Sequence, residues 1–235
     1  MRSLAGKRAP IQAGRVKIVI AEDHLMFREV LRKVCVRDLH HAVVGEAADG
    51  PAAVELVART APDLLLLDLH LPKLDGFGVM EAVRQSAPKV RILVLSSHCD
   101  DYTVFRVEQA HVQGFVDKNT NTVTTLKAAI AAVGQGKAYF STTFQRLKAA
   151  RLSDAHSFDK LLTERERAVL VLIGEPLSDR EIAVRLGISN ETVEKHRFNL
   201  LGKLSLKSTA ELARYARERG FTLSARRDDK GALLP

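Results

Sequence analysis

The sequence predicts an α/β domain built on a doubly wound parallel sheet of five strands, followed by a small all-α domain. From Val16 to about Gly136, short apolar runs alternate five times with helical patterns. This alternation is typical of a parallel sheet that carries helices on both faces. From Leu161 to about Tyr215 the apolar spacing is helical throughout. We therefore expect two domains of different class.

Apolar runs and helical spacing place the elements of the first domain in order. Strands are expected over residues 16–21, 64–67, 91–95 and 114–117, and helices over 24–36, 51–58, 76–85, 101–109 and 121–133. The clearest strand is Leu64–Leu67, a run of leucines with no turn signal. A parallel strand that is buried on both faces is apolar throughout, so this run favours a central strand.

Composition and charge divide the 235 residues into five segments. We expect a disordered basic tail over 1–15, the α/β domain over 16–136, a linker over 137–160, the helical domain over 161–220 and a disordered tail over 221–235. The net charge of +8 is uneven: residues 18–132 hold 12 basic and 15 acidic side chains, whereas residues 160–220 hold 12 basic and 9 acidic ones. A basic second domain is consistent with a polyanionic partner such as nucleic acid.

Charged and hydroxyl side chains follow the ends of the predicted strands. They are Glu22, Asp23, Asp68, Ser96 and Lys118. Each alone is typical of a turn or a helix cap, but the carboxyl ends of parallel strands meet at one crevice, where open α/β sheets bind ligands. The carboxylates are hard ligands suited to Mg²⁺. Asp68 stands alone at its strand end and is the predicted nucleophile, because aspartyl groups form acyl phosphates. Lys118 and Ser96 would stabilise the phosphoryl oxygens.

Residues 16–135 resemble the receiver domain of two-component response regulators. The stretches that carry the resemblance are residues 18–24, 62–68, 95–97 and 114–118. The resemblance implies a flavodoxin-like fold and transfer of phosphate from a sensor histidine kinase to Asp68. It further implies Mg²⁺ ligated by Glu22, Asp23, Asp68 and the backbone carbonyl of His70, with Ser96 and Phe115 as the switch pair.

The second domain contains the pattern of a helix-turn-helix. Ser178 with Glu181 predicts a capped first helix, Gly187 predicts a tight turn, and Ser189 caps a helix that begins at about Asn190. The second helix of such a motif enters the major groove. Its first turns present Asn190, Thr192, Glu194, Lys195, Arg197 and Phe198 as candidate DNA contacts. By pattern alone, a purely structural helical domain remains an alternative to DNA binding.

Residues 162–170 and 178–196 resemble the DNA-binding domain of the LuxR/NarL family. The resemblance implies binding to double-stranded DNA. Glu194 stands where the family usually has a lysine, and a glutamate can accept a hydrogen bond from cytosine N4, so a different site preference is expected. A final helix over 208–219 carries Leu212 and Tyr215, which are expected to serve packing or dimerisation.

Two further features bear on where the protein acts. No apolar stretch approaches the ~20 residues that span a bilayer, and residues 1–15 lack the apolar core of a signal peptide, so we expect a cytoplasmic protein with no membrane partner. Cys35 and Cys99 have no metal-ligand spacing and are expected to be buried, reduced thiols.

The expected function is that of a phosphorylation-dependent transcriptional regulator that is not an enzyme and that dimerises when phosphorylated. A dimer would read half-sites about one helical turn apart. One alternative is a haloacid-dehalogenase-like phosphatase, which needs a second Asp two residues after the nucleophile, where this chain has His70. Another is a phosphorylation-independent regulator whose first domain is a dimerisation scaffold. His70 and His98, each two residues after a site residue, are expected to border the pocket.

Overall fold

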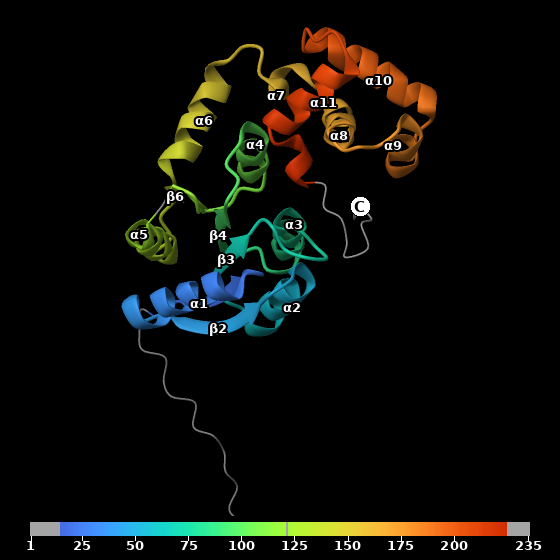
Figure 1. Ribbon diagram of the computed structural model, residues 1–235. Helices are drawn as coiled ribbons and strands as arrows, with labels where there is room; N and C mark the ends of the chain where they lie inside the picture. The colour runs from blue at the N-terminus through green and yellow to red at the C-terminus, as the bar shows by residue number, and fades with distance from the viewer. Residues whose placement is uncertain (1–14, 121, 225–235) are drawn as a thin grey trace, which may run out of the picture.

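The computed structural model describes residues 15–120 and 122–224 and shows an α/β domain joined to a helical domain (Figure 1). The strands are β1 (Lys17–Ala21), β2 (Ala42–Ala47), β3 (Leu64–Asp68), β4 (Arg91–Ser96), β5 (Gly114–Asp117) and β6 (Tyr139–Phe140). The helices between them are α1 (Leu25–Lys33), which continues as a π-helical turn over Val34–Asp38, α2 (Gly50–Thr60), α3 (Gly76–Ser86), α4 (Asp101–Gln109) and α5 (Val123–Gly134). All strand pairs are parallel, in the order β2-β1-β3-β4-β5-β6. The predicted fold class is confirmed.

Helices cover both faces of the sheet and bury the strands between them. Alternate residues of a strand face opposite sides of the sheet. Leu65 packs with α2, α3 and α4, whereas Leu66 packs with α1 and α5. All residues of β3 are buried, as its run of leucines predicts. Each buried leucine contributes about 1.5–3 kcal/mol relative to an exposed one. The strand that ends at Asp68 is therefore firmly anchored.

The sheet has one strand more than predicted. After α5 the chain returns along the free edge of β5, where the N–H of Tyr139 donates to the carbonyl of Gln113 at 3.0 Å, and the N–H of Ser141 donates to the carbonyl of Phe115 at 2.9 Å. The expected five strands become six because Tyr139 and Phe140, read as linker, are aromatic residues that favour an extended edge position.

The rest of the predicted linker is also structured. It forms α6 (Thr142–Ser153) and α7 (Phe158–Leu161). Arg151 of α6 is buried, and its guanidinium forms ion pairs with Glu108 of α4 and Asp159 of α7. The two ion pairs tie α6 to α4 of the first domain and to α7, because removal of either carboxylate would leave a buried charge without that partner.

The helical domain is built from four helices around one core. They are α8 (Glu164–Ile173), α9 (Asp179–Leu186), α10 (Asn190–Lys203) and α11 (Thr209–Glu218). Thr163 with Glu166, and Ser178 with Glu181, form the reciprocal hydrogen bonds of a capping box. Gly187 ends α9 with a φ of 62°, a left-handed conformation that glycine adopts without strain. The turn places α9 and α10 as a helix-turn-helix.

The predicted tail over 221–235 is wrong at its start. Phe221–Ser224 form a 3-10 helix, and Phe221 is fully buried in the core of the helical domain. The segment is ordered despite its polar composition because the Phe221 ring packs among other aromatic rings. Residues 1–14 and 225–235, which were expected to form tails, lie outside the described residues.

The two domains contact one another through α4. Tyr102 stacks on Phe221 with ring centroids 4.1 Å apart, and Phe105 meets Phe158 edge-on at 5.4 Å. The N–H of Tyr102 also donates to the carbonyl of Arg219 at 3.1 Å. Such aromatic pairs add about 0.5–1.5 kcal/mol beyond their buried area. Helix α10 lies on the far side of the helical domain from the sheet (Figure 1).

Among the described residues, no helix is long and apolar enough to cross a membrane. Both cysteines are free, but only one matches the prediction fully. Cys35 is buried, whereas Cys99 is half-buried in the loop between β4 and α4. Burial raises the pKa of each thiol to about 12, so both are neutral near pH 7.

Candidate functional site

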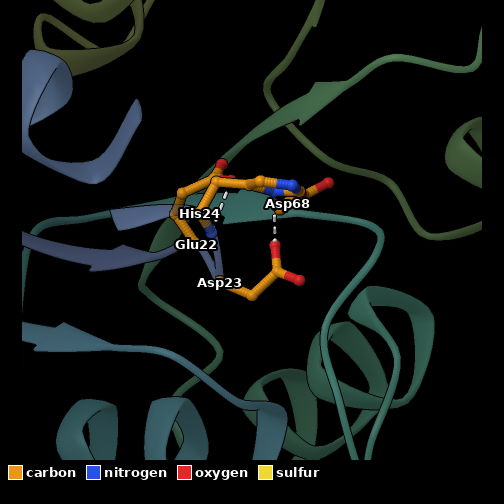
Figure 2. A group of neighbouring side chains, drawn as sticks. All are labelled: Glu22, Asp23, His24 and Asp68. Atoms are coloured by element: carbon orange, nitrogen blue, oxygen red, sulfur yellow. Dashed lines mark hydrogen bonds and ion pairs between the residues drawn. The ribbon is translucent and has the colours of Figure 1, made fainter. Parts of the chain in front are cut away.

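Carboxylates from two adjacent strands meet at the carboxyl edge of the sheet. Glu22 and Asp23 follow β1, and Asp68 is the last residue of β3, which pairs with β1 so that Ala21 lies opposite Leu67. Figure 2 shows these side chains turned toward one another together with His24. One ligand atom from each of the four residues lies within 4.8 Å of the others. The predicted convergence is therefore present.

Lys118 joins this group from the end of β5. Its Nζ donates to Glu22 Oε2 at 2.7 Å and to Asp68 Oδ2 at 2.9 Å, and it lies 4.6 Å from the centroid of the Phe27 ring. Its backbone N–H donates to the carbonyl of Ser96 at 2.8 Å, which fixes the loop after β5 to the end of β4. We call Glu22, Asp23, Asp68 and Lys118 the carboxylate pocket.

The negative charge of the carboxylate pocket favours a cation beside it. Glu22 is fully buried and Asp68 is 3% exposed. Burial, together with the repulsion from Asp68, raises the pKa of Glu22, and the hydrogen bond and charge of Lys118 oppose that rise. Buried carboxylates this close together favour binding of a cation. Three carboxylates are hard oxygen donors, so the residues present fit Mg²⁺.

The expected switch residues are both buried. Ser96 is fully buried at the end of β4, where its Oγ accepts a hydrogen bond from the N–H of His98 at 3.1 Å. Phe115 is also fully buried, and its ring centroid lies 5.0 Å from that of Phe144 in α6. The structure thus shows the inward orientation of Phe115 and connects this ring to the linker helix.

Three histidines surround the carboxylate pocket. His70 and His98 border it as expected: the N–H of His70 donates to Asp68 Oδ1 at 3.0 Å, and the centroids of the two rings are 4.4 Å apart. His24 was expected only to start a helix, but its Nδ1 lies 3.0 Å from Asp23 Oδ1. Its place immediately after two acids at a strand end was the signal that could have identified it.

Helix α10 presents an open face with mixed chemistry. Glu194, Lys195 and Phe198 are exposed, and the Phe198 side chain is 78% exposed. Val193 and Leu200 are fully buried on the opposite face. A single exposed ring is common on soluble proteins, so Phe198 supports a contact surface only together with the charged side chains beside it.

The other predicted DNA contacts have partners within their own domain. Arg197 forms an ion pair with Asp179 at the start of α9. Thr192 Oγ1 lies 2.9 Å from the capping hydroxyl of Ser189. Asn190 Nδ2 donates to Glu194 Oε1 at 2.9 Å, which orients that carboxylate at the open face. These contacts link the three side chains to other groups of the domain, and their contact with DNA stays a prediction.

The two residues expected to serve packing or dimerisation lie on α11. Leu212 is fully buried in the core of the helical domain, so the structure assigns it to packing. Tyr215 is half-buried, and its ring centroid lies 6.4 Å from that of Phe221 beside α4. A contribution of Tyr215 to a dimer stays a prediction.

Comparison with known proteins agrees with this geometry. Residues 18–131 match the family model of the response regulator receiver domain, and residues 160–216 match the model of bacterial regulatory proteins of the luxR family. The transcriptional regulatory protein YhcZ of Bacillus subtilis is 35% identical over 205 residues, covering 86% of this chain and 95% of that protein. A nitrate/nitrite response regulator protein homolog of Haemophilus influenzae is 30% identical, covering 83% of this chain and 92% of the relative.

Solved structures agree with the two-domain arrangement. RcsB from Salmonella enterica serovar Typhimurium bound to the promoter rprA is 25% identical, with a TM-score of 0.63 over 86% of this chain and 98% of that chain. An RcsB–DNA complex is 26% identical, with a TM-score of 0.60 over 87% and 98% of the two chains. With its receiver domain and its luxR-type helix-turn-helix, the chain belongs to the LuxR/NarL family of DNA-binding response regulators.

Proposed function

We propose that a sensor histidine kinase phosphorylates Asp68 and that this modification controls binding of the helical domain to double-stranded DNA. The observation that carries the proposal is the buried contact between Asp68 Oδ2 and Lys118 Nζ at 2.9 Å, beside the buried Glu22. It supports a carboxylate prepared to carry additional negative charge, because the ammonium group is already in place.

The chemistry is transfer of a phosphoryl group from a phosphohistidine to a carboxylate. An oxygen of Asp68 attacks the phosphorus, the P–O bond forms as the P–N bond breaks, and the departing imidazole keeps the electron pair and takes up a proton. Lys118 and the Ser96 hydroxyl then neutralise the phosphoryl oxygens. Mg²⁺, held by Glu22, Asp23, Asp68 and the His70 carbonyl, would supply further positive charge there.

Three residues of α10 are proposed to read DNA bases. Glu194 suits the N4 donor of cytosine, Lys195 suits the acceptors of guanine, and Phe198 suits the methyl group of thymine. All three are exposed on one face of the helix. Asn190, Thr192 and Arg197 contribute by fixing the helix and its carboxylate, as their contacts within the domain indicate.

The loop between β4 and α4 is the proposed connection between the two sites. It begins at Ser96, and Asp100 near its end accepts from the N–H of Thr103 at 2.8 Å to cap α4. The next turn carries Tyr102, which stacks on the helical domain. A shift of Ser96 toward a phosphoryl group would displace the start of α4 and weaken the docking of the domains. To invert a 1:99 equilibrium, phosphorylation must supply about 5.5 kcal/mol of differential stabilisation.

A phosphorylated protein of this kind is proposed to act in the cytoplasm, where DNA is accessible, as a homodimer on paired half-sites. RcsB, a structural relative, is described as two dimers bound to two parallel DNAs. Release of the helical domain from α4 would expose Tyr215, which lies beside that contact and was predicted to serve a dimer.

The test is phosphoprotein formation with acetyl phosphate and Mg²⁺, followed on a phosphate-affinity gel for the parent and for Asp68→Asn. We expect a Mg²⁺-dependent shifted band that is absent from the variant, and tighter DNA binding by the shifted species. A parent protein that shows no shift but still binds DNA would favour the alternative of a phosphorylation-independent regulator with a receiver used as a dimerisation scaffold.

A further inference from the structure

A cavity of about 850 Å³ lies between the receiver and the helical domain, apart from the carboxylate pocket. Its walls come from α3 and α4 on one side and from α8 on the other. The lining residues that matter for a ligand are Phe77, Arg84, Tyr102, Phe105, Arg106 and Arg167. Pockets that bind small molecules have volumes of about 300–1,000 Å³, are mostly apolar with a few polar groups, and occur preferentially at domain interfaces.

Within this cavity, Arg106 is the residue best placed to bind a ligand. Its guanidinium lies 3.6 Å from the centroid of the Phe77 ring, and burial lowers its pKa. In the described part of the chain it forms no hydrogen bond and no ion pair. The Phe77 ring covers one face of the guanidinium. The N–H donors lie in the plane of the guanidinium and remain available to an acceptor. Its side chain is partly buried, and the nearby charge of Asp75 stabilises the cation without forming an ion pair with it. Because its N–H donors lack a protein acceptor, an anion in the cavity would be favoured.

The neighbouring charges restrict what that anion can be. Arg84 already donates to the backbone carbonyls of Pro88, Val90 and His111 and contributes mainly positive charge. Two carboxylates, Glu81 and Glu164, also line the cavity and would repel a molecule that is anionic at both ends. The ligand must therefore carry its negative charge at one end.

Aromatic rings define the rest of the site. Phe77 and Tyr102 belong to the receiver, and Phe105 lies 5.2 Å from the guanidinium carbon of Arg167 in α8. A planar ring would find apolar contact with these residues and with the guanidinium planes. Because the walls come from both domains, an occupant would contact α4 and α8 at the same time.

We propose that this interdomain cavity binds a small planar aromatic anion, with its carboxylate, phosphonate or phosphate group on the in-plane donors of Arg106 and its ring among Phe77, Tyr102 and Phe105. A guanidinium fork matches such groups through paired hydrogen bonds. The bound molecule holds α4 against the helical domain and so acts against release of that domain. The inference goes beyond the proposed function and does not depend on Asp68.

The test is isothermal titration of the full-length protein with phenylphosphonate, in EDTA and without Mg²⁺ to silence the carboxylate pocket. Inorganic phosphate supplies the anion without the ring, and benzyl alcohol supplies the ring without the charge. We expect phenylphosphonate to bind and each partial probe to bind at least about tenfold more weakly, because both the charge and the ring contribute.

Matched variants place the binding in the cavity. Arg106→Gln should weaken phenylphosphonate binding about tenfold or more, and Arg106→Lys, which keeps the charge but not the fork, should also weaken it. Arg59→Gln, on the surface of α2, should bind as the parent does. Asp68→Asn should also bind as the parent does.

The inference is overturned by no binding of phenylphosphonate at millimolar concentration, by equal binding of inorganic phosphate, or by unchanged binding by both Arg106 variants. Circular dichroism of each variant confirms that lost binding does not reflect lost folding, and Arg106→Lys provides a second variant if Arg106→Gln does not fold. Loss of binding in Asp68→Asn would assign the ligand to the carboxylate pocket and so also contradict the proposal.

Discussion

The carboxylate pocket and helix α10 differ in how their functional side chains are brought into place. In the pocket, the ends of three strands supply Glu22, Asp68 and Lys118. Because the strands are parallel, these ends meet at one edge of the sheet and bring the three side chains together. On α10 the candidates are neighbours along a single helix. Arg197 has turned to Asp179, whereas Lys195 two residues earlier is exposed.

The difference shows what a sequence pattern fixes. A residue at the end of a buried parallel strand has its direction set by the sheet. A polar residue on a helix surface has several possible partners, at positions three or four residues away or on the next helix. Pattern alone therefore identifies which face of α10 is polar, but it does not identify which of its polar side chains remain available to DNA.

Replacement of Lys118 by methionine is the strongest test of the pocket. Lys118→Met removes the cation that bonds both Glu22 and Asp68, so phosphoprotein formation from acetyl phosphate should slow about 10²–10³-fold, the usual cost of losing one preplaced donor. Initial rates on a phosphate-affinity gel measure the effect. Lys127→Met, which removes a surface ion pair with Asp38, is the control. Equal rates in Lys118→Met and in the parent would disprove the assigned role.

Substitution of Lys195 tests the open face of α10. Lys195→Ala should weaken DNA binding by about 1–3 kcal/mol, which is roughly 5- to 150-fold, and relax the preference at one base position. Fluorescence anisotropy with the selected binding site and with single-base variants of it measures both effects. Lys137→Ala, on an exposed residue before β6, is the matched control. A uniform loss across all sites would assign Lys195 to the phosphate backbone instead.

Arg197 should behave differently although it lies two residues away. Because its guanidinium pairs with Asp179 and its side chain is 23% exposed, Arg197→Ala should lower the free energy of unfolding of the helical domain by about 1–3 kcal/mol. The base preference should not change. Urea denaturation of Arg197→Ala, Asp179→Ala and the double variant gives the coupling energy. A changed base preference with unchanged stability would instead support the prediction that Arg197 contacts DNA.

Sequence reasoning succeeded where residue pattern and topology act together. The leucines of β3 fixed a buried strand, and Asp68 followed as its last residue. The capping box of Ser178 with Glu181 located the start of α9. In these places local hydrogen bonds and burial favour the same structure, so no tertiary contact is needed to decide between alternatives.

It failed where a distant contact decides the structure. Tyr139 and Phe140 extend only because β5 offers a free edge. Phe221 is ordered because Tyr102, far away in the sequence, provides a ring to stack on. Each of these residues depends on a partner that adjacent sequence does not reveal.

The histidines beside Asp68 should affect how long a phosphoryl group persists. His70 and His98 place their rings 4.4 Å apart beside Asp68 and Ser96. We expect these rings to limit the approach of water to a phosphoryl group. His70→Ala and His98→Ala should each change the dephosphorylation rate several-fold, with faster loss expected where the ring shields the phosphoryl group. Decay of the shifted band after removal of the phosphodonor measures the rate. His156→Ala, far from the pocket in the segment before α7, is the control, and parent-like decay in both test variants would contradict the assignment.

The smallest expected effect tests the connection between the two regions. Tyr102 stacks on Phe221 at 4.1 Å, while Phe198 is exposed on α10, so Tyr102→Ala should loosen the domains and Phe198→Ala should not. Small-angle scattering should therefore show a larger radius of gyration for Tyr102→Ala only. If docking restrains the helical domain, the same variant should bind DNA more tightly without phosphorylation, because release no longer requires a change at Ser96. A variant that opens without any gain in DNA binding would show that α4 connects the domains but does not regulate α10, and regulation would then have to act through the dimer.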